Sequence, residues 1–238
     1  MIELEIEPIR RRLAGLRREL AAHIAPSSVS HAGGGEDLVA LSWLRDRVPT
    51  LSAIRYLDVG AADPVYLSNT YLFYRLGGSG VLVEPDPRYE RQIRGRRPRD
   101  ILISAGAKFD DRESADLLRF SSPLFNTFSP DQAEIVVQTS RGWGQGKGQS
   151  LNSRVSRPLR AMNDILEEHF SSSPLHLLSI DTDGVNFAVF KSVDFEKFSP
   201  LVVCVECQAS LQEHLAVAGP RYELIYRGPD NFMLALVR

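Results

Sequence analysis

The sequence lacks the features expected of a membrane, secreted or nucleic-acid-binding protein. No apolar run reaches the roughly 18–20 residues that a membrane span requires, and the N-terminal residues are too charged for a signal peptide. The 28 lysine and arginine residues are balanced by 30 aspartate and glutamate residues, so charge predicts no nucleic-acid partner. We therefore expect a soluble, cytoplasmic protein with no membrane span.

Cysteine is also scarce, since the chain contains only Cys204 and Cys207. Their spacing could belong to a redox motif or to half of a zinc site, but a zinc site would need further Cys or His ligands nearby in the sequence. Both residues stand at the end of an apolar run. We therefore expect ordinary buried or half-buried thiols.

The first 50 residues are predicted to form an N-terminal helical extension and a linker. Apolar residues recur every three to four positions over residues 2–24, which predicts an amphipathic helix. Its arginine-rich opposite face is most simply a solvated face, and the alternatives are a membrane surface or a homo-oligomer contact through this helix. Serines and three consecutive glycines in residues 26–35 predict a linker, and a second short helix near residues 37–47 leads into the main domain.

The main domain, residues 51–238, alternates short β-type runs with helical stretches. Strands are predicted over residues 54–59, 80–83, 101–104, 175–180 and 201–205, with helices over 71–76, 87–94 and about 160–170. This alternation predicts right-handed crossovers and an open parallel sheet. The last two strands, 222–226 and 232–237, are joined by a connection so short that they must form an antiparallel hairpin.

We therefore expect an α/β, Rossmann-like fold: a mostly parallel seven-stranded sheet with a C-terminal antiparallel hairpin and helices on both faces. This plan resembles that of class I methyltransferases that use S-adenosylmethionine.

A long insertion, residues 108–174, separates the third and fourth predicted strands and is too long for one crossover helix. It contains a strand-like piece at 153–157 and a glycine-rich segment, 141–149, which lacks the spacing of a phosphate-binding P-loop. Long loops in compact domains are often functional. We expect the glycine-rich segment to act as a lid over the acceptor, and the alternative is an inert surface excursion.

Three strand ends suggest a nucleoside site. The first strand ends at Asp58 and is followed by the small residues Gly60 and Ala61, which let a backbone approach a ligand closely. The second ends at Glu84, whose carboxylate could accept hydrogen bonds from both ribose hydroxyls of an adenosine. The third ends at Ser104 and Ala105, which could flank an adenine ring. The loop lacks the G-x-G-x-x-G pattern of NAD-binding proteins.

Further carboxylates follow the fourth and fifth strands. Asp181 and Asp183 leave the buried strand at 177–180, and Glu206 ends the next one. Such a cluster could bind a cation, with Mg²⁺ the candidate, or divide acid and base roles between its members. Asp183 could instead cap the following helix.

These segments, taken in order, resemble the FkbM-type methyltransferases. The similar segments are Asp58-Val-Gly-Ala, Ser68-Asn69-Thr70-Tyr71, Glu84-Pro85, Asn126-Thr127-Phe128-Ser129, Ile180–Gly184 followed by Val189-Phe190-Lys191, and Pro200–Glu206. The resemblance covers roughly residues 53–210 and implies a class I fold, S-adenosylmethionine as donor, and O-methylation of sugars or natural products. Asp183 departs from the family, which commonly has Glu at this position.

We therefore predict an S-adenosylmethionine-dependent O-methyltransferase acting on a small-molecule or glycan hydroxyl. The residues expected to bind the donor are Asp58, Gly60, Ala61, Asn69, Glu84, Pro85, Ser104, Ala105 and Asp181. Asp181 is expected to act as the catalytic base or a metal ligand, with Asp183 second. Two alternatives remain: a nucleotide-sugar glycosyltransferase using Asp181-Thr182-Asp183 as a D-x-D motif, and a non-catalytic binding protein on a methyltransferase fold.

Overall fold

The computed structural model describes residues 29–139 and 149–237. The predicted helix at 2–24, with the homo-oligomer contact proposed for it, and all of the glycine-rich segment except Gln149 lie outside the described residues. Within the described part of the chain, no helix is both long and apolar enough to cross a membrane.

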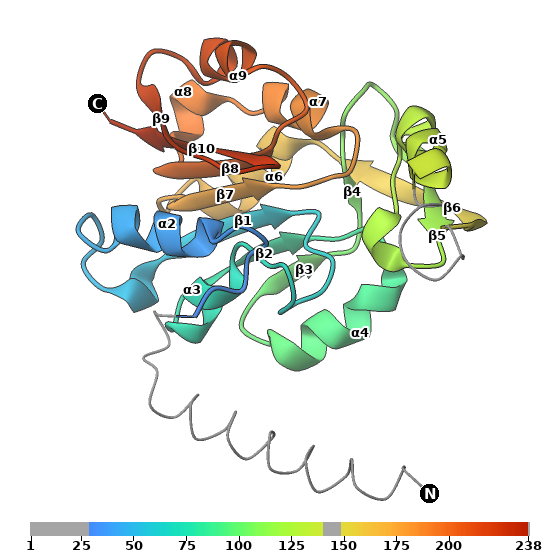
Figure 1. The fold of residues 1–238 in the computed structure, drawn as a ribbon. Coiled ribbons are helices and arrows are strands. Elements are labelled where there is room, and N and C mark those ends of the chain that lie inside the picture. The colour runs from blue at the N-terminus through green and yellow to red at the C-terminus, as the bar shows by residue number, and fades with distance from the viewer. Residues whose placement is uncertain (1–28, 140–148, 238) are drawn as a thin grey trace, which may run out of the picture.

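The centre of the fold is a seven-stranded sheet with the order β3-β2-β1-β7-β8-β10-β9 (Figure 1). The strands are β1 (Arg55–Val59), β2 (Ser79–Val83), β3 (Ile101–Ile103), β7 (Leu177–Ile180), β8 (Val202–Glu206), β9 (Tyr222–Arg227) and β10 (Asn231–Leu236). The first five are mutually parallel, and β10 pairs antiparallel with both β8 and β9. The predicted mostly parallel sheet with a C-terminal hairpin is confirmed.

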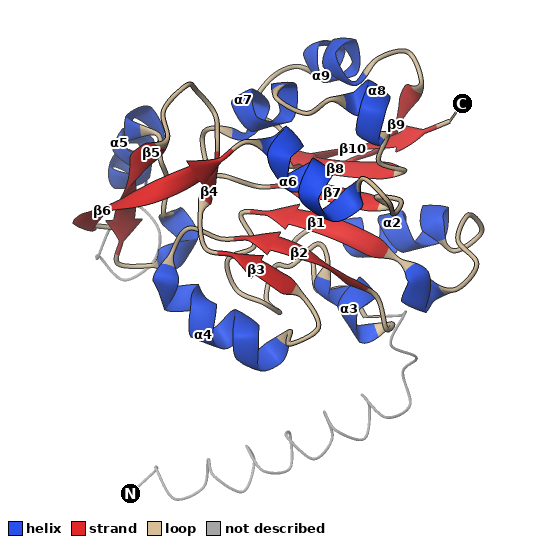
Figure 2. Cartoon of the chain, turned by 180° about the vertical axis from the view of Figure 1, so that it is seen from behind, coloured by secondary structure: helices blue, strands red, loops and turns tan. Residues whose placement is uncertain are grey.

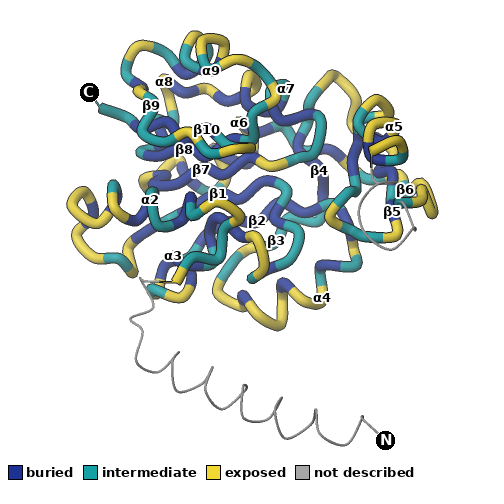
Figure 3. Tube along the Cα trace, in the orientation of Figure 1, coloured by how far each residue is buried: buried dark blue, intermediate teal, exposed yellow. Residues whose placement is uncertain are grey.

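Helices cover both faces of this sheet (Figure 2). One face packs against α2 (Glu36–Leu44), α3 (Tyr71–Arg75) and α4 (Pro87–Arg96), and the other against α6 (Met162–Phe170), α7 (Asn186–Lys191), α8 (Phe195–Phe198) and α9 (Leu211–Ala218). Alternate residues of β1 supply the two cores: Tyr56 joins the first, and Leu57 and Val59 join the second. The inner strands β1, β2, β7, β8 and β10 are almost wholly buried, as the tube in Figure 3 shows, which explains their near-continuous apolar sequences. The edge strands β3 and β9 are more exposed.

The insertion forms a second, smaller sheet beside the first. Its order is β4-β6-β5, with β4 (Gly106–Ala107), β5 (Ser114–Phe120) and β6 (Leu151–Arg160). The 3-10 turn η4 (Pro123–Phe125) and helix α5 (Pro130–Thr139) connect β5 to the segment before β6. The sequence predicted only the middle of β6. It missed β5, where inward residues such as Ala115 and Leu117 alternate with the exposed Ser114 and Asp116.

Residues 33–50 are packed parts of the same structure. Ala40, Leu41 and Leu44 of α2 are buried in the core of the first face, and the 3-10 turn η3 (Leu51–Ala53) leads directly into β1. Helix α2, which precedes the predicted boundary at residue 50, therefore packs against the main domain. The two cysteines are free, with Cys204 buried and Cys207 half-buried, as the sequence predicted.

Candidate functional site

A cavity of about 380 Å³ opens at the carboxyl ends of the parallel strands. This is within the range of small-molecule sites and is where open α/β sheets place their ligands. Its wall combines the residues after β1, β2 and β7 with β4 of the small sheet. Gly33 and Gly34, Glu36 at the start of α2, and residues 229–231 of the C-terminal hairpin complete it. Because β10 runs antiparallel to β8, the hairpin turn that precedes it lies at this same edge.

The turn after β1 is shaped by the neighbouring strand. Gly60 has a φ of 83°, and a Cβ there would lie 1.7 Å from the carbonyl oxygen of Asp181. Only glycine fits this position, because any side chain would displace the backbone of the β7 exit. From the sequence, we predicted that this glycine lets the backbone approach a ligand closely. The structure shows that contact with Asp181 already requires it, while Gly60, Ala61 and Ala62 also line the cavity.

Glu84 lies at the end of β2 with its carboxylate in the cavity wall. Its Oε2 accepts a hydrogen bond from the Ala62 N–H at 2.8 Å, and its Oε1 accepts one from the Asp86 N–H at 2.7 Å. Burial raises the pKa of Glu84 to about 7, and these two N–H donors oppose that shift. A carboxylate has about four acceptor positions, so two bonds leave room for ligand hydroxyls.

Asp58, in contrast, does not line the cavity. It is 4% exposed, and its carboxylate accepts a hydrogen bond from the Thr70 hydroxyl. The fully buried Arg97 lies 4.0 Å from the same oxygen and donates to Asp100 at 2.7 Å and to Thr70 at 2.9 Å. Burial raises the pKa of Asp58, while Arg97 opposes that shift. Asp58 therefore supports the segment that carries Asn69 without reaching the cavity itself.

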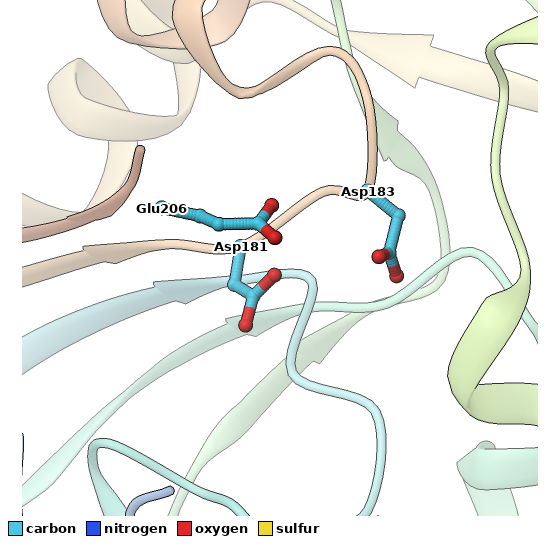
Figure 4. Close-up of side chains that lie close together, drawn as sticks. All are labelled: Asp181, Asp183 and Glu206. Atoms are coloured by element: carbon cyan, nitrogen blue, oxygen red, sulfur yellow. The ribbon is translucent and has the colours of Figure 1, made fainter. Parts of the chain in front are cut away.

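Three carboxylates gather on the opposite wall. One oxygen from each of Asp181, Asp183 and Glu206 lies within 4.8 Å of the others. Figure 4 shows Asp181 and Glu206 at adjacent strand ends, with Asp183 on the loop that leaves β7. Such a spacing is compatible with binding of one cation by all three carboxylates.

The loop after β7 positions these groups. Asn186, at the start of α7, donates to Glu206 and accepts hydrogen bonds from the N–H and hydroxyl of Thr182. Asp183 has a φ of 41°, and its carbonyl oxygen accepts a hydrogen bond from the Thr127 hydroxyl. The N-cap of α7 is Val185, without a side-chain cap. The alternative that Asp183 caps this helix is therefore wrong.

Mutual repulsion and enclosure make this cluster hold protons unusually well. Asp181 is accessible from the cavity, yet protein surrounds it on the remaining sides; this burial, followed by the charge of Glu206, raises its pKa to about 7. Burial and then the Asp181 charge raise the pKa of Asp183 to about 8. Burial also raises the pKa of Glu206, against its hydrogen bond from Asn186. Perturbed carboxylates in a cavity are typical of functional sites.

The structure brings most of the predicted residues together. Those lining the cavity are Gly60, Ala61, Asn69, Glu84, Pro85, Asp181, Asp183 and Glu206. Asp58 does not, and neither do Ser104 and Ala105. The side chain and carbonyl of Ser104 instead accept hydrogen bonds from Arg157. The chain reaches the cavity two residues later, at Gly106 and Ala107. The predicted third strand, 101–104, matches β3 to within one residue. The sequence could not show how far the chain continues before it turns inward.

Sequence reasoning missed several cavity residues. Glu36 lies between the predicted linker, 26–35, and the predicted helix near 37–47, and Asp230 lies in the predicted hairpin connection. Neither was assigned a role. Asn126, Thr127 and Phe128 also line the cavity, and Asn126 donates to Asp86 at 2.7 Å. That stretch had been singled out only as similar to a family.

This sheet order and edge cavity define a class I methyltransferase fold. A sequence model of the Methyltransferase FkbM domain family matches residues 58–221, which is more than half of the chain. The chain therefore belongs to the FkbM methyltransferase family, as the sequence motifs predicted. No curated protein sequence matches it.

Three solved structures resemble the fold at low sequence identity. A TehB-like SAM-dependent methyltransferase from Corynebacterium glutamicum has 10% identity and a TM-score of 0.41, covering 96% of this chain and 97% of its own. The putative methyltransferase yhhF from Escherichia coli has 11% identity and a TM-score of 0.43, covering 88% and 90%. An O-methyltransferase from Bacillus cereus in complex with SAH has 15% identity and a TM-score of 0.40, covering 94% and 88%. The family assignment rests on the domain match.

Proposed function

We propose that this protein transfers a methyl group from S-adenosylmethionine to a hydroxyl of a sugar, glycan or natural product. The observation that supports it most directly is the cavity at the strand ends, where the small residues after β1 lie between Glu84 at the end of β2 and the acidic exit of β7. S-adenosylmethionine, when bound, supplies a methyl group already activated by its sulfonium.

The residues present suit such a donor. Glu84 has unfilled acceptor positions for ribose hydroxyls. Gly106 and Ala107 line the cavity at the end of the neighbouring segment, and Asn69 and Pro85 lie in the same wall. Asp58 contributes indirectly, because it stabilises the Ser68–Thr70 turn that presents Asn69. We assign it a supporting role in place of the direct donor contact that the sequence suggested.

Asp181 is the proposed catalytic base. A base works best when its pKa lies near the operating pH, and the pKa of Asp181 is raised to about 7. Accepting a proton from the acceptor hydroxyl would also relieve the repulsion between Asp181 and Glu206. Asp183 is the second candidate. Holding the hydroxyl in line with the methyl group supplies the larger share of the rate enhancement, on the order of 7–11 kcal/mol in favourable cases.

The decisive experiment has two arms. Calorimetry with S-adenosylmethionine and S-adenosylhomocysteine tests the donor site, and transfer from labelled donor to a panel of hydroxylated sugars and natural products tests the reaction. Donor binding with turnover supports the proposal, whereas donor binding without turnover on any hydroxyl acceptor favours a binding protein. Binding of a nucleotide sugar in place of the donor would favour the glycosyltransferase alternative. The described cavity wall offers no basic side chain for a diphosphate.

A further inference from the structure

The charged side chains of the cavity wall are all of one sign. Within the described residues, no lysine, arginine or histidine lines the cavity. The acidic residues that line it are Glu36, Glu84, Asp181, Asp183, Glu206 and Asp230. The whole chain has nearly equal numbers of acidic and basic residues, so this separation is a property of the site and not of the composition.

Three acidic groups of this wall, those of Asp181, Asp183 and Glu206, also differ in their partners from acidic groups elsewhere in the fold. Elsewhere, Asp100 pairs with Arg97 and Asp86 pairs with Arg88. In the described structure, the carboxylates of Asp181 and Asp183 accept no hydrogen bond and pair with no cation, and both border the cavity. Glu206 has only the neutral amide of Asn186. Three carboxylates this close together without a cation repel one another, so a cationic ligand that contacts them is favoured.

The donor alone does not balance these charges. S-adenosylmethionine combines a sulfonium and an ammonium with one carboxylate, so it brings a net charge of about +1 against six acidic residues. Glu84 is already assigned to the ribose. The three clustered carboxylates therefore remain available to the second substrate.

The rim adds an independent feature that suits a cation. Tyr66 lines the cavity and is 64% exposed, an unusual exposure for a large aromatic side chain. The neighbouring Leu67 is 45% exposed and has a φ of 59°, so the surrounding structure holds this pair outward against local backbone preference. An aromatic face attracts ammonium groups and also packs against the C–H faces of sugars.

We propose that the methyl acceptor is a hydroxylated amine, such as an amino sugar, whose ammonium is bound by Asp183 and Glu206 beside the face of Tyr66. The inference rests on the proposed methyltransferase function, because it concerns the acceptor of that reaction. Asp181 is left to receive the hydroxyl proton. Acceptors bearing phosphate or carboxylate groups are disfavoured by the same charges.

The test compares three probes that share one ring: D-glucosamine, N-acetyl-D-glucosamine and D-glucosamine 6-phosphate. Each is titrated by calorimetry into the full chain saturated with S-adenosylhomocysteine, with and without a chelator. We expect the cationic probe to bind at least about tenfold more tightly than the N-acetylated one, with the phosphate the weakest. Glu206→Gln should reduce this preference severalfold, whereas Glu223→Gln, on the exposed edge of β9, should leave it unchanged.

Equal or tighter binding of the N-acetylated or phosphorylated probe would overturn the proposal, and so would a lack of glucosamine binding. Loss of glucosamine binding in the chelator, restored by Mg²⁺, would also overturn it, because the carboxylates would then be metal ligands. Binding of S-adenosylhomocysteine is measured first, because it distinguishes failure of the acceptor inference from failure of the proposed methyltransferase function. If it binds and glucosamine does not, only the acceptor inference fails; if it does not bind, the proposed function fails.

Discussion

Two acidic strand ends that look alike in the sequence have opposite surroundings in the structure. Asp58 lies near the end of β1 and Asp181 lies directly after β7, and in each case a glycine follows within three residues. Asp58 is sealed beneath the cavity with Arg97 and Thr70, whereas Asp181 opens into the cavity without a cationic partner. The first carboxylate stabilises the fold of the site, and the second is available for chemistry.

Strand register explains the difference. Asp58 is paired with Ser179, so Asp181 lies two residues further toward the carboxyl edge of the sheet. At about 3.3 Å per residue, this is a displacement of roughly 6–7 Å along the strand. That distance places the Asp58 carboxylate beneath the turn after β1 and the Asp181 carboxylate beyond it. A sequence motif that records only an acidic residue at the end of a strand does not show how neighbouring strands are aligned. It therefore cannot distinguish Asp58 from Asp181.

The largest expected effect comes from removing the open carboxylate. Asp181→Asn keeps the shape of the side chain but cannot accept the hydroxyl proton, so turnover should fall by about 10²- to 10⁴-fold. Unfolding free energy should not decrease, because the repulsion with Glu206 is relieved. Steady-state transfer assays and urea denaturation measure the two quantities. Asp46→Asn, at an exposed site, is the charge-matched control; equal rates in both variants would remove Asp181 from the mechanism.

The sealed carboxylate should show the reverse pattern, with stability lost first. Arg97→Met leaves Asp58 and Asp100 buried without their cation, which should lower the free energy of unfolding by about 3–5 kcal/mol. Arg94→Met is the matched control, because its ion pair with Glu90 is exposed and should be worth about 1 kcal/mol or less. Urea denaturation of both variants measures this. A loss no larger than that of the control would show that Arg97 is not essential to this network.

Glu84 has features of both regions, since it is held by backbone N–H groups and still faces the cavity. Glu84→Ala should weaken S-adenosylmethionine binding by about 1.5–3 kcal/mol, the scale of hydrogen bonds to a charged group. Calorimetry on the folded variant measures this, with Glu90→Ala, on the exposed side of α4, as the control. Unchanged affinity would rule out the ribose contact.

The sequence was sufficient for the main sheet because its strands are short, apolar and separated by helical segments. The hairpin followed from a five-residue connection, and the order of motifs identified the family. The small sheet was harder to predict. In β6, only Leu159 is buried while most of the strand is exposed, so little hydrophobic pattern marked it.

The site was predicted where side chains leave a strand end directly, as at Glu84, Asp181 and Glu206. It was missed where tertiary packing brings remote segments to the edge, as for Glu36. That side chain reaches the cavity because its Oε2 accepts from the Gly34 N–H and its Oε1 accepts from the Asn231 side chain, nearly two hundred residues away. No local pattern encodes such a contact.

The smallest expected effect concerns the pH dependence of the open cluster. The folded-state pKa of Asp183 is raised from 3.8 to about 8, so between these values the folded protein holds a proton that the unfolded chain releases. This group therefore stabilises the fold most at low pH, and its contribution is lost as the pH rises toward 8. The variant Asp183→Asn lacks this titrating group, so its stability should not depend on pH in this way.

The unfolding free energy of the variant, relative to that of the original protein, should therefore rise between about pH 5 and about pH 8. The expected rise is on the order of 1 kcal/mol once solvent screening in the cavity is included. Urea denaturation at both pH values measures the difference, and Asp46→Asn should show none. A difference that stays constant with pH, or falls, would mean that the pKa of Asp183 is not raised in the folded protein, and the contrast with Asp58, whose charge Arg97 compensates, would be lost.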